Sequence, residues 1–417
     1  MFALPLLPTC RACVPGRWIG VLVLAVALAV ALAATAGRAT AGFTLGPEVN
    51  LSNSPEPSGV AEVSPQGLAV DGEGRVIVVW NEFKSADSTP EVAMRVSGPD
   101  GRFSPPVRLT KDDGKYSGEA ALAVLPDGKV MVAWTQQNEQ FAIWVARIDL
   151  AVGQLVEPKA IPGSASQLVM EPTIAAGPKG ELAVAWTTMA SMAFEVKLCR
   201  FQPGGGPGPI ESLGVLGPSE QPCLTYGSDG RLHAVWVGHA AGVRQIFYSV
   251  HDGKQWQTPR AVEATDEPVK EVRPEVVIGP KEEVVVAWHD ARQGGVDNVI
   301  VARAEPGKPF GKATAATRGS GTARSPALAA GPGGVYLAWE DGRVLSMAEP
   351  PSVQIYLGGL AAAAGPVTEE KPITTDRPVT CDHPAMVIDR TGTLHLMWRN
   401  AEIGQGDVFY RKATPES

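Results

Sequence analysis

A short apolar segment that ends in tryptophan recurs seven times along this chain. The first copy reads VIVVW at residues 76–80, and the later copies vary the same apolar pattern. Successive tryptophans are 54, 52, 50, 52, 51 and 59 residues apart. A repeat of this length indicates an array of like structural units, and it takes precedence over any residue-by-residue interpretation. The tryptophans that end the segments are Trp80, Trp134, Trp186, Trp236, Trp288, Trp339 and Trp398.

Each unit has the pattern of four strands joined by turns. The tryptophan segment is apolar on both of its alternating faces, so we expect both faces of that strand to be covered. A shorter apolar strand such as 173–176 precedes it, and Gly-containing turns such as 71–74 and 126–128 supply hairpin chemistry. A polar loop, a third strand such as 245–250, a second turn and a fourth strand such as 258–262 follow. Four antiparallel strands per unit, with the sheets stacked face to face, describe a blade of a β-propeller.

The seventh unit is incomplete at its end. After Trp398 the chain has room for only one further strand. The missing strand is found near the other end, because residues 45–52 (LGPEVNLS) resemble residues 103–110 (FSPPVRLT), the fourth strand of the first unit. We infer that residues 43–52 complete the seventh blade, since closing the ring removes exposed sheet edges. The sequence therefore predicts an all-β fold, a single seven-bladed β-propeller that occupies residues 42–417.

The first 41 residues have the layout of a signal peptide and are left out of the predicted fold. Arg11 and Arg17 precede an apolar run at residues 18–34, and an A-T-A triplet at 39–41 provides the small residues of a cleavage site. We therefore expect export to the periplasm or the extracellular space. The alternative is an uncleaved membrane anchor, because the apolar run approaches the length needed to span a bilayer.

The charge of the chain limits its partners. Residues 1–41 hold three arginines and no other charged residue, so the rest of the chain has 33 basic and 44 acidic residues and a formal net charge of −11. This acidic balance disfavours DNA, RNA and anionic lipid as partners. We expect a monomer whose partner is a glycan or a protein.

The cysteines, the histidines and the known catalytic motifs give no sign of a cofactor or a metal centre. Beyond the predicted signal peptide the chain has Cys199, Cys223 and Cys381, an odd number without metal-type spacing, and we expect buried or free thiols. His233 and His395 both stand three residues before a repeat tryptophan, which interior packing explains better than metal binding. G-x-S-x-G, H-E-x-x-H and P-loop motifs are absent from the sequence. We predict no cofactor and no metal.

Two kinds of motif resemble those of the sialidase-like β-propeller superfamily. Residues 249–256 (SVHDGKQW) resemble a loosened Asp-box, the repeat of bacterial neuraminidases, and residues 97–103 (SGPDGRF) are a weaker copy. The segments 288–292 (WHDAR) and 339–343 (WEDGR) are similar to the W-x-D-x-R units of the same superfamily. The resemblance spans about residues 43–412 and implies the propeller fold.

The chain departs from that superfamily in two respects. Sialidases have six blades, whereas the repeat predicts seven here. The early R-I-P element of the family, which brings one arginine of the triad that binds the substrate carboxylate, is absent from the first unit. The resemblance therefore supports the fold more than it supports a sialidase activity.

The predicted fold brings charged residues together at one mouth of the central channel. In a propeller the first strand of each blade lines the channel, and the loop that enters this strand shares a face with the loop after the second strand. Loops on a rigid scaffold are where sites usually form. The candidate ligand-binding residues at this mouth are Glu119, Glu171, Arg273, Asp290, Arg292, Arg324, Asp341, Arg343, Asp382 and His383.

These residues suggest a funnel for a polar or anionic ligand. Arg273 and Arg324 occupy near-equivalent positions in neighbouring blades, and they would grip one anion together because a guanidinium fork suits carboxylate and phosphate. Glu119 and Glu171 are neighbours in the same sense and would form an acid–base pair for sugar hydrolysis, given a suitable gap. A solvated mouth, with no ligand, is the alternative for these four charges.

Two Asp–Arg pairs in this set have a simpler interpretation. Asp290 with Arg292, and Asp341 with Arg343, stand two residues apart, just after a repeat tryptophan. Ion pairs are common structural devices, so we expect each pair to brace its own loop.

We predict an exported, non-enzymatic binding or scaffold module that presents the channel mouth to a glycan or a protein. The prediction rests on the charged mouth, together with the absence of a recognisable catalytic set in the sequence. The alternative is a sialidase-like glycosidase, in which Arg273 and Arg324, with Arg292 or Arg343, hold an acidic sugar and a glutamate assists the chemistry. A third interpretation is a component of an assembly that is held by its blade faces.

Overall fold

Regular structure in the described part of the chain consists of β-strands only. Gly42–Ser417 forms one compact unit, and no helix among the described residues is long and apolar enough to cross a membrane. The predicted signal peptide at 1–41 lies outside the described residues. The computed structural model describes residues 42–416 with the exception of 53–57, 60–65, 85–87, 191, 214–216, 264, 266–267, 270–272, 292–294, 318–320, 344–352, 362–364, 375–379 and 403–404.

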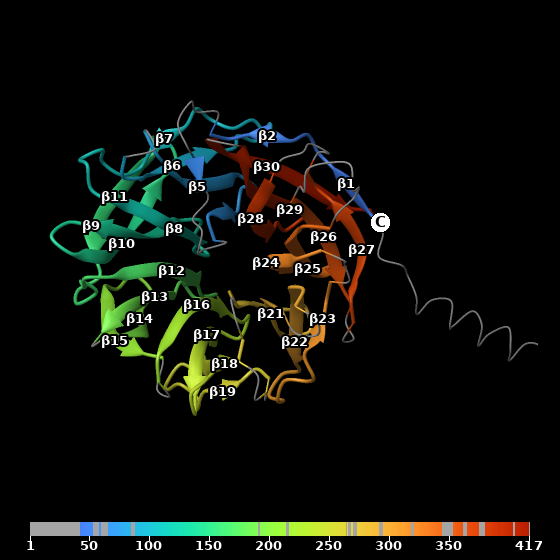
Figure 1. Cartoon of the computed structure of the whole chain (residues 1–417). Helices are drawn as coiled ribbons and strands as arrows, with labels where there is room; N and C mark the ends of the chain where they lie inside the picture. Colours follow the sequence, from blue (N-terminus) through green and yellow to red (C-terminus); the bar gives the residue numbers. More distant parts are fainter. Residues whose placement is uncertain are drawn as a thin grey trace, which may run out of the picture. The chain divides into compact units, whose positions relative to one another are not determined.

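Seven antiparallel sheets form the blades, and Figure 1 shows them arranged around a central axis. The predicted seven-bladed propeller is therefore confirmed. Blade 1 contains β3 (Ser58–Gly59), β4 (Leu68–Val70), β5 (Val76–Glu82), β6 (Glu91–Val96) and β7 (Val107–Arg108). Blade 2 contains β8 (Ser117–Val124), β9 (Val130–Gln137), β10 (Phe141–Asp149) and β11 (Gln154–Ala160). Blade 3 contains β12 (Val169–Ala176), β13 (Leu182–Ala190), β14 (Ala193–Phe201) and β15 (Pro207–Ser212).

The remaining blades repeat this order. Blade 4 contains β16 (Ser219–Tyr226), β17 (Leu232–Ala240), β18 (Val243–His251) and β19 (Arg260–Ala261). Blade 5 contains β20 (Glu275–Ile278), β21 (Val284–Asp290), β22 (Asn298–Ala304) and β23 (Thr314–Ala315). Blade 6 contains β24 (Ala323–Gly331), β25 (Gly334–Asp341), β26 (Gln354–Leu360) and β27 (Val367–Pro372). Blade 7 contains β28 (Thr380–Ile388), β29 (Leu394–Glu402), β30 (Gln405–Pro415), β1 (Phe43–Leu45) and β2 (Val49–Asn50).

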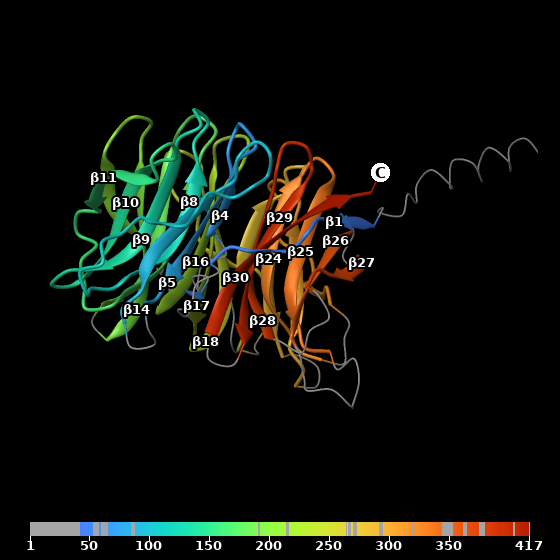
Figure 2. The same ribbon diagram turned by 90° about the horizontal axis from the view of Figure 1, so that it is seen from above.

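The antiparallel strand order gives the propeller two different ends, and the strands of every blade run between them (Figure 2). At the turn end lie the turns between first and second strands and those between third and fourth strands. At the loop end lie the loops between second and third strands and the connections from blade to blade. The turns between first and second strands at the turn end are residues 71–75, 125–129, 177–181, 227–231, 279–283, 332–333 and 389–393.

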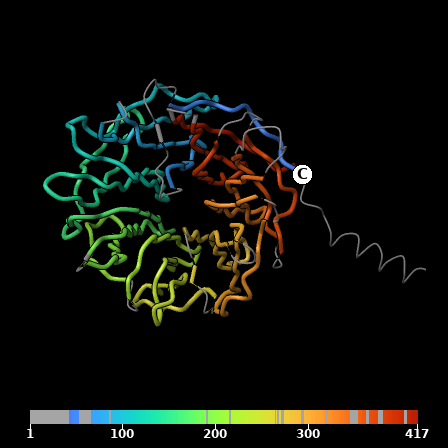
Figure 3. Tube along the Cα trace, viewed as in Figure 1, coloured from blue at the N-terminus to red at the C-terminus, as the bar shows by residue number. Residues whose placement is uncertain are grey.

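The amino-terminal strand closes the ring, as the sequence predicts. β1 pairs with β30 in the register Phe43↔Pro415 to Leu45↔Ala413, and the N–H of Leu51 donates to the carbonyl of Val408 at 2.7 Å. In Figure 3 the blue start of the propeller follows the red carboxy-terminal strand. Blade 7 therefore gains its outer strand from the opposite end of the described chain.

Each interface between two blades is one apolar cluster, and each cluster contains one repeat tryptophan. Trp288 packs with Val235 and Val237 of blade 4, whereas Val285 and Ala287 of the same strand pack with blade 6. The tryptophan strand is thus covered on both faces, which explains its unbroken apolar pattern. None of the seven tryptophans is more than 2% exposed.

The residue before the tryptophan is small in several blades, and packing explains why. Ala185 of β13 lies in the same cluster as Trp236 of the next blade, and Ala287 shares a cluster with Trp339. A methyl group at this position leaves room for the neighbouring indole, because protein interiors are close-packed.

Removal of an apolar contact of the closing segment tests the importance of closure. Leu51 is fully buried in the cluster that joins blade 7 to Trp80 of blade 1. We expect Leu51→Ala to lower the free energy of unfolding by about 2–5 kcal/mol, because it leaves a cavity at this interface. Chemical denaturation measures the change, and Val152→Ala, at a side chain that is 60% exposed, is the control. A loss below about 1 kcal/mol for Leu51→Ala would show that the closing segment contributes little.

Candidate functional site

The first strand of most blades bulges at the loop end. Its pairing with the second strand shifts register in β8, β12, β16, β24 and β28. One residue of each bulge adopts a φ between 47° and 59°, a conformation that costs a non-glycine residue about 1–3 kcal/mol. The surrounding structure must therefore hold these residues in place. They are Glu119, Glu171, Gln221, Ser325 and His383.

Hydrogen bonds between neighbouring blades hold the bulged residues. The N–H of Glu119 donates to Asn81 Oδ1 at 3.0 Å, and the N–H of Glu171 donates to Glu119 Oε2 at 2.8 Å. The N–H of Gln221 in turn donates to Glu171 Oε2 at 2.9 Å. Every acceptor belongs to the blade before that of its donor. The bonds therefore connect blades 1 to 4 in series around the channel.

The same arrangement joins blades 6 and 7, where the N–H of His383 donates to Glu340 Oε1 at 2.8 Å. Glu340 and Asn81 both directly follow a repeat tryptophan. The position after the tryptophan therefore supplies acceptors for the next blade.

Glu119 and Glu171, the predicted acid–base pair, are both part of this series. Glu119 Oε2 also accepts from Thr135 Oγ1 at 3.1 Å, and Glu171 Oε2 accepts from Thr187 Oγ1 at 2.6 Å. Burial raises the pKa of Glu119 to about 7, although the N–H of Glu171 and the Thr135 hydroxyl act against the shift. Burial likewise raises the pKa of Glu171. Both carboxyl groups tie blades together, and their use in sugar hydrolysis stays a prediction.

Arg273 lies among carboxyl groups near the channel. Burial lowers its pKa to about 10, and the charges of Glu275, Glu171, Glu340 and Glu119 oppose that shift. Burial raises the pKa of Glu275 to about 8, while the charge of Arg273 acts in the opposite direction. The surroundings of this guanidinium are acidic, so its charge is balanced from within the protein.

Arginines at the loop end have separate acidic partners. Arg324 forms an ion pair with Asp297, and Arg399 forms a two-point pair with Asp382 at 2.7 and 2.6 Å. The structure thus gives Arg273 and Arg324 different carboxylate neighbours. Binding of one anion by Arg273 and Arg324 together stays a prediction.

The bracing role expected of one Asp–Arg pair is confirmed. Arg343 Nε donates to Asp341 Oδ1 at 2.8 Å, and Arg343 Nη1 donates to Glu370 Oε1 at 2.7 Å. The guanidinium also lies 4.2 Å from the centre of the Tyr356 ring. Arg292 lies outside the described residues, so the bracing of its own loop stays a prediction.

Asp290 and His383 occupy different surroundings. Asp290 is buried at the end of β21 and stands opposite Asn298 in the strand register. His383 Nδ1 lies 3.0 Å from Asp382 Oδ1. None of the ten predicted ligand-binding residues lines either of the two cavities described below.

The histidines and cysteines serve packing, as expected. His233 Nδ1 and Tyr248 Oη are 2.7 Å apart inside blade 4, and His395 and Tyr410 repeat this contact in blade 7. The cysteines are free and buried, namely Cys199, Cys223 and Cys381. Among the described residues no group of three or more His, Cys, Asp and Glu side chains is placed to hold a metal ion.

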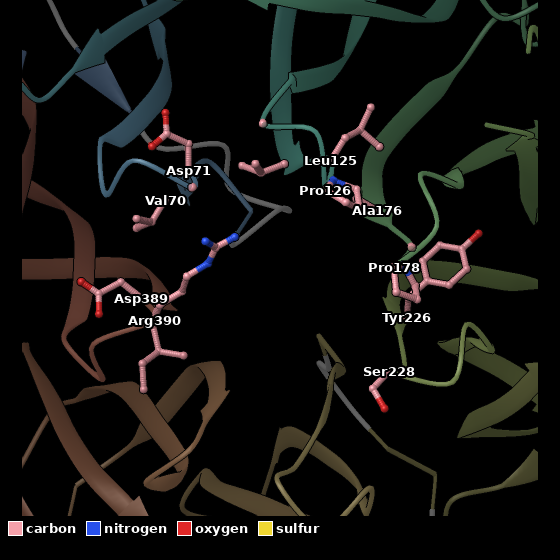
Figure 4. A pocket seen from close by; sticks show the side chains of 16 residues that line it. Val70, Asp71, Leu125, Pro126, Ala176, Pro178, Tyr226, Ser228, Asp389 and Arg390 are labelled. Atoms are coloured by element: carbon pink, nitrogen blue, oxygen red, sulfur yellow. The ribbon is translucent and has the colours of Figure 1, made fainter. Parts of the chain in front are cut away.

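A cavity of about 370 Å³ opens at the turn end of the channel, opposite the predicted mouth. It is lined by the turns between first and second strands in five blades, and Figure 4 shows its side chains. Its lining residues are Val70, Asp71, Gly72, Val124, Leu125, Pro126, Gly128, Ala176, Gly177, Pro178, Tyr226, Gly227, Ser228, Ile388, Asp389 and Arg390.

The polar groups of this cavity differ in their freedom to bind a ligand. Asp71 Oδ1 accepts from the N–H of Arg75, and Asp389 Oδ1 accepts from the N–H of Thr393, both at 2.9 Å. These carboxylates stabilise their own turns and point away from the centre in Figure 4, whereas the guanidinium of Arg390 points inwards. Arg390 makes no hydrogen bond and no ion pair with the described residues. It is therefore the cation available to a ligand in this cavity.

Sequence reasoning missed Arg390, although a signal for it exists. Arg390 stands eight residues before its tryptophan, where the other units carry small or turn-forming residues, as at Gly72, Pro126, Pro178 and Ser228. A long cation at a position that elsewhere only shapes a turn indicates a role beyond the turn. Hairpin chemistry explains the small residues of these turns, but it gives no reason for a long cation at Arg390.

The buried carboxyl group of Glu119 makes stability depend on pH in a defined direction. Its pKa rises from an ordinary value of 4.5 to about 7 in the folded chain. The folded chain thus keeps a proton that the unfolded chain releases, so this contribution to stability is fully present below about pH 4.5 and is lost as pH rises to about 7. Glu119→Gln removes the titration but keeps an acceptor oxygen. We expect the free energy of unfolding of the variant, relative to wild type, to rise by about 1–3 kcal/mol between about pH 5 and pH 8.

Urea denaturation at several pH values measures this difference. Glu139→Gln, at an exposed residue between β9 and β10, makes the same change of side chain away from the blade interfaces and is the matched control. A difference between Glu119→Gln and wild type that does not change with pH would contradict the raised pKa of Glu119.

Comparison with known proteins places the chain by its fold. No protein-family model and no curated protein matches it. The solved structures that resemble it include sialidases, polysaccharide lyases and other propeller domains. A protein of unknown function from Dyadobacter fermentans matches with 15% identity over 90% of this chain and 100% of that chain, at a TM-score of 0.56.

Two carbohydrate-active proteins are among the matched structures. An ulvan lyase, bound to a saccharide of glucuronate and sulfated rhamnose, matches with 8% identity over 87% of this chain and 95% of that chain, at a TM-score of 0.58. The sialidase of Trypanosoma rangeli matches with 9% identity over 89% of this chain and 59% of that chain, at a TM-score of 0.46. At such low identity the likeness to the ulvan lyase shows the fold alone.

Proposed function

We propose that the protein is a non-catalytic propeller that binds an acidic saccharide at the turn end of its channel. One observation carries the proposal: the guanidinium of Arg390 points into a cavity of about 370 Å³ and makes no hydrogen bond or ion pair with the described residues. A guanidinium offers a planar fork of donors that matches carboxylate and sulfate groups. The ligand group at Arg390 is therefore a uronate or a sulfate.

The rest of the cavity suits a sugar ring. Its wall includes Val70, Leu125, Pro126 and Pro178, whose apolar surfaces fit the C–H face of a pyranose. Ligand cavities typically have apolar walls, few polar groups and a volume of about 300–1,000 Å³. The volume here lies near the lower end of this range, which suits a short saccharide. The acidic saccharide in the structure of the ulvan lyase supports the same class of ligand for this fold.

The sialidase-like alternative has less support. It requires several arginines that converge on one sugar carboxylate, with a carboxyl group free to transfer a proton. At the loop end Arg324 pairs with Asp297, and Arg343 pairs with Asp341. We therefore interpret the Asp-box resemblance as a relationship of fold.

Export directed by a signal peptide at residues 1–41 remains part of the proposal.

Calorimetric titration with digalacturonate tests the proposed site. We expect Arg390→Ala to weaken binding at least 10-fold, because the ligand carboxylate loses its charged partner, and Arg390→Lys to weaken it less. Lys179→Ala is the matched control, since Lys179 lies in the equivalent turn of blade 3 and does not line the cavity. Neutral galactobiose should bind wild type more weakly than digalacturonate does, and Arg390→Ala should change its binding little. Equal affinity of wild type and Arg390→Ala would refute the proposed site.

An activity assay separates binding from catalysis. Wild-type protein is incubated with sialyllactose and with oligogalacturonate, and product formation is followed by chromatography. We expect no turnover. Turnover that Arg273→Ala abolishes would contradict the non-catalytic proposal and support the sialidase-like alternative.

A further inference from the structure

A second, larger cavity lies between blades 5 and 6. Its volume is about 1,020 Å³, and it is formed by the turn after β20, the strand β22, the turn between β22 and β23, and the segment after β26. All of these turns belong to the turn end. This cavity, called the groove from here on, therefore opens towards the same end of the propeller as the cavity of Arg390.

The exposed charge of the groove is positive, although the propeller as a whole is acidic. Arg303 and Glu283 are both mostly buried and lie 3.5 Å apart, so they balance one another at the base. Lys281, Lys308 and Lys312 are exposed around them. In the part of the chain that the structure describes, none of these three ammonium groups forms an ion pair. They are thus available to a ligand.

Glu305 is the other acidic side chain that lines the groove. Three lysines against this one carboxylate leave an excess of two positive charges after Arg303 and Glu283 have balanced. The excess contrasts with the net charge of −11 over residues 42–417. A concave basic surface on an acidic protein concentrates anions locally.

The groove also has a fixed apolar surface. Phe310 is half-buried, and its ring meets the Tyr248 ring edge-on at a centroid distance of 5.2 Å. The guanidinium of Arg260 lies 5.4 Å from the centre of the Phe310 ring, and Arg260 also donates to the carbonyl of Lys308 at 3.1 Å. Contacts from blade 4 therefore hold the turn between β22 and β23 in place. A rigid aromatic surface beside lysines suits the C–H face of an acidic sugar.

We propose that this groove binds a segment of an acidic polysaccharide, with its uronate or sulfate groups on Lys281, Lys308 and Lys312. The volume accommodates several sugar units, more than the cavity of Arg390. Single-stranded nucleic acid is disfavoured, because it needs successive aromatic platforms and Phe310 is the one aromatic residue that lines the groove in the described chain. The inference shares its ligand class with the proposed function but rests on different residues.

The two sites are adjacent through their turns. Ser228, which lines the cavity of Arg390, donates from its hydroxyl to Glu282 Oε1 at 2.9 Å. Glu282 follows Lys281 in the turn that borders the groove. A polysaccharide that occupies the groove can thus continue across this turn towards the channel. Binding at two linked sites raises the apparent affinity for a long chain over that for a short one.

Biolayer interferometry with immobilised polygalacturonate tests the groove. We expect the double variant Lys308→Glu with Lys312→Glu to bind at least 10-fold more weakly than wild type, and we expect wild-type binding to weaken as salt screens the charges. The matched control is Lys179→Glu with Lys254→Glu, which makes the same change of charge at exposed turn-end lysines outside the groove. Wild-type affinity of the groove variant would overturn the proposal.

Short and long ligands distinguish this proposal from the proposed function. The groove variant should bind digalacturonate as wild type does. Arg390→Ala should lose digalacturonate binding but still bind the polymer through the groove, more weakly than wild type because one of the two linked contacts is gone. If Arg390→Ala leaves digalacturonate binding unchanged, the channel proposal fails while the groove result still stands. A single-stranded DNA oligonucleotide that binds the groove more tightly than polygalacturonate would overturn the assignment to polysaccharide. Neutral dextran should not bind.

Discussion

The tryptophan strand inside each sheet is apolar on both faces, and each face must be covered by a neighbouring sheet. In a stack of such sheets, the outer faces of the first and last sheets are covered only when these two sheets pack against each other. The apolar composition of the strands therefore requires the ring to close. Trp80 marks the interface where blades 7 and 1 meet, and Leu51 contributes to it from the closing segment. On each second strand a tryptophan packs against one neighbouring sheet, and a smaller residue on the opposite face leaves room for the tryptophan of the other neighbouring sheet.

Near the channel the first strands of five blades bulge, and hydrogen bonds from two of the bulges hold the carboxyl groups of the preceding blades in place. Glu119 and Glu171 accept hydrogen bonds from strained backbone in the next blade. Burial then raises their pKa. Residues with these properties resemble catalytic acids, yet structural networks perturb pKa values as well. Here the series of inter-blade bonds accounts for the carboxyl groups without a substrate.

The sequence allowed the architecture to be predicted further than the site. Regular tryptophan spacing and the likeness of residues 45–52 to residues 103–110 determine blade number and closure, because both follow from the repeat itself. The bracing of Asp341 by Arg343 was also predictable, since their separation in sequence is two residues. Ion pairs between residues of different blades could not be predicted from the sequence. An example is Arg324, which pairs with Asp297 across a blade interface. Whether a turn leaves a cavity depends on how side chains such as Arg390 fill the channel, which periodicity does not encode.

The two ends of the propeller differ in whether their cationic side chains have acidic partners. At the loop end the described arginines that sequence analysis proposed for a ligand, such as Arg324 and Arg343, are paired with carboxylates. At the turn end Arg390 and the lysines of the groove have no such partners among the described residues. A net charge of −11 over residues 42–417 repels polyanions in general. A polyanionic ligand is therefore attracted only where local cations outweigh the negative potential of the protein. Under the proposed function, the acidic surface would discourage non-specific binding of polyanions, and the basic groove would determine where and in which orientation an acidic ligand binds.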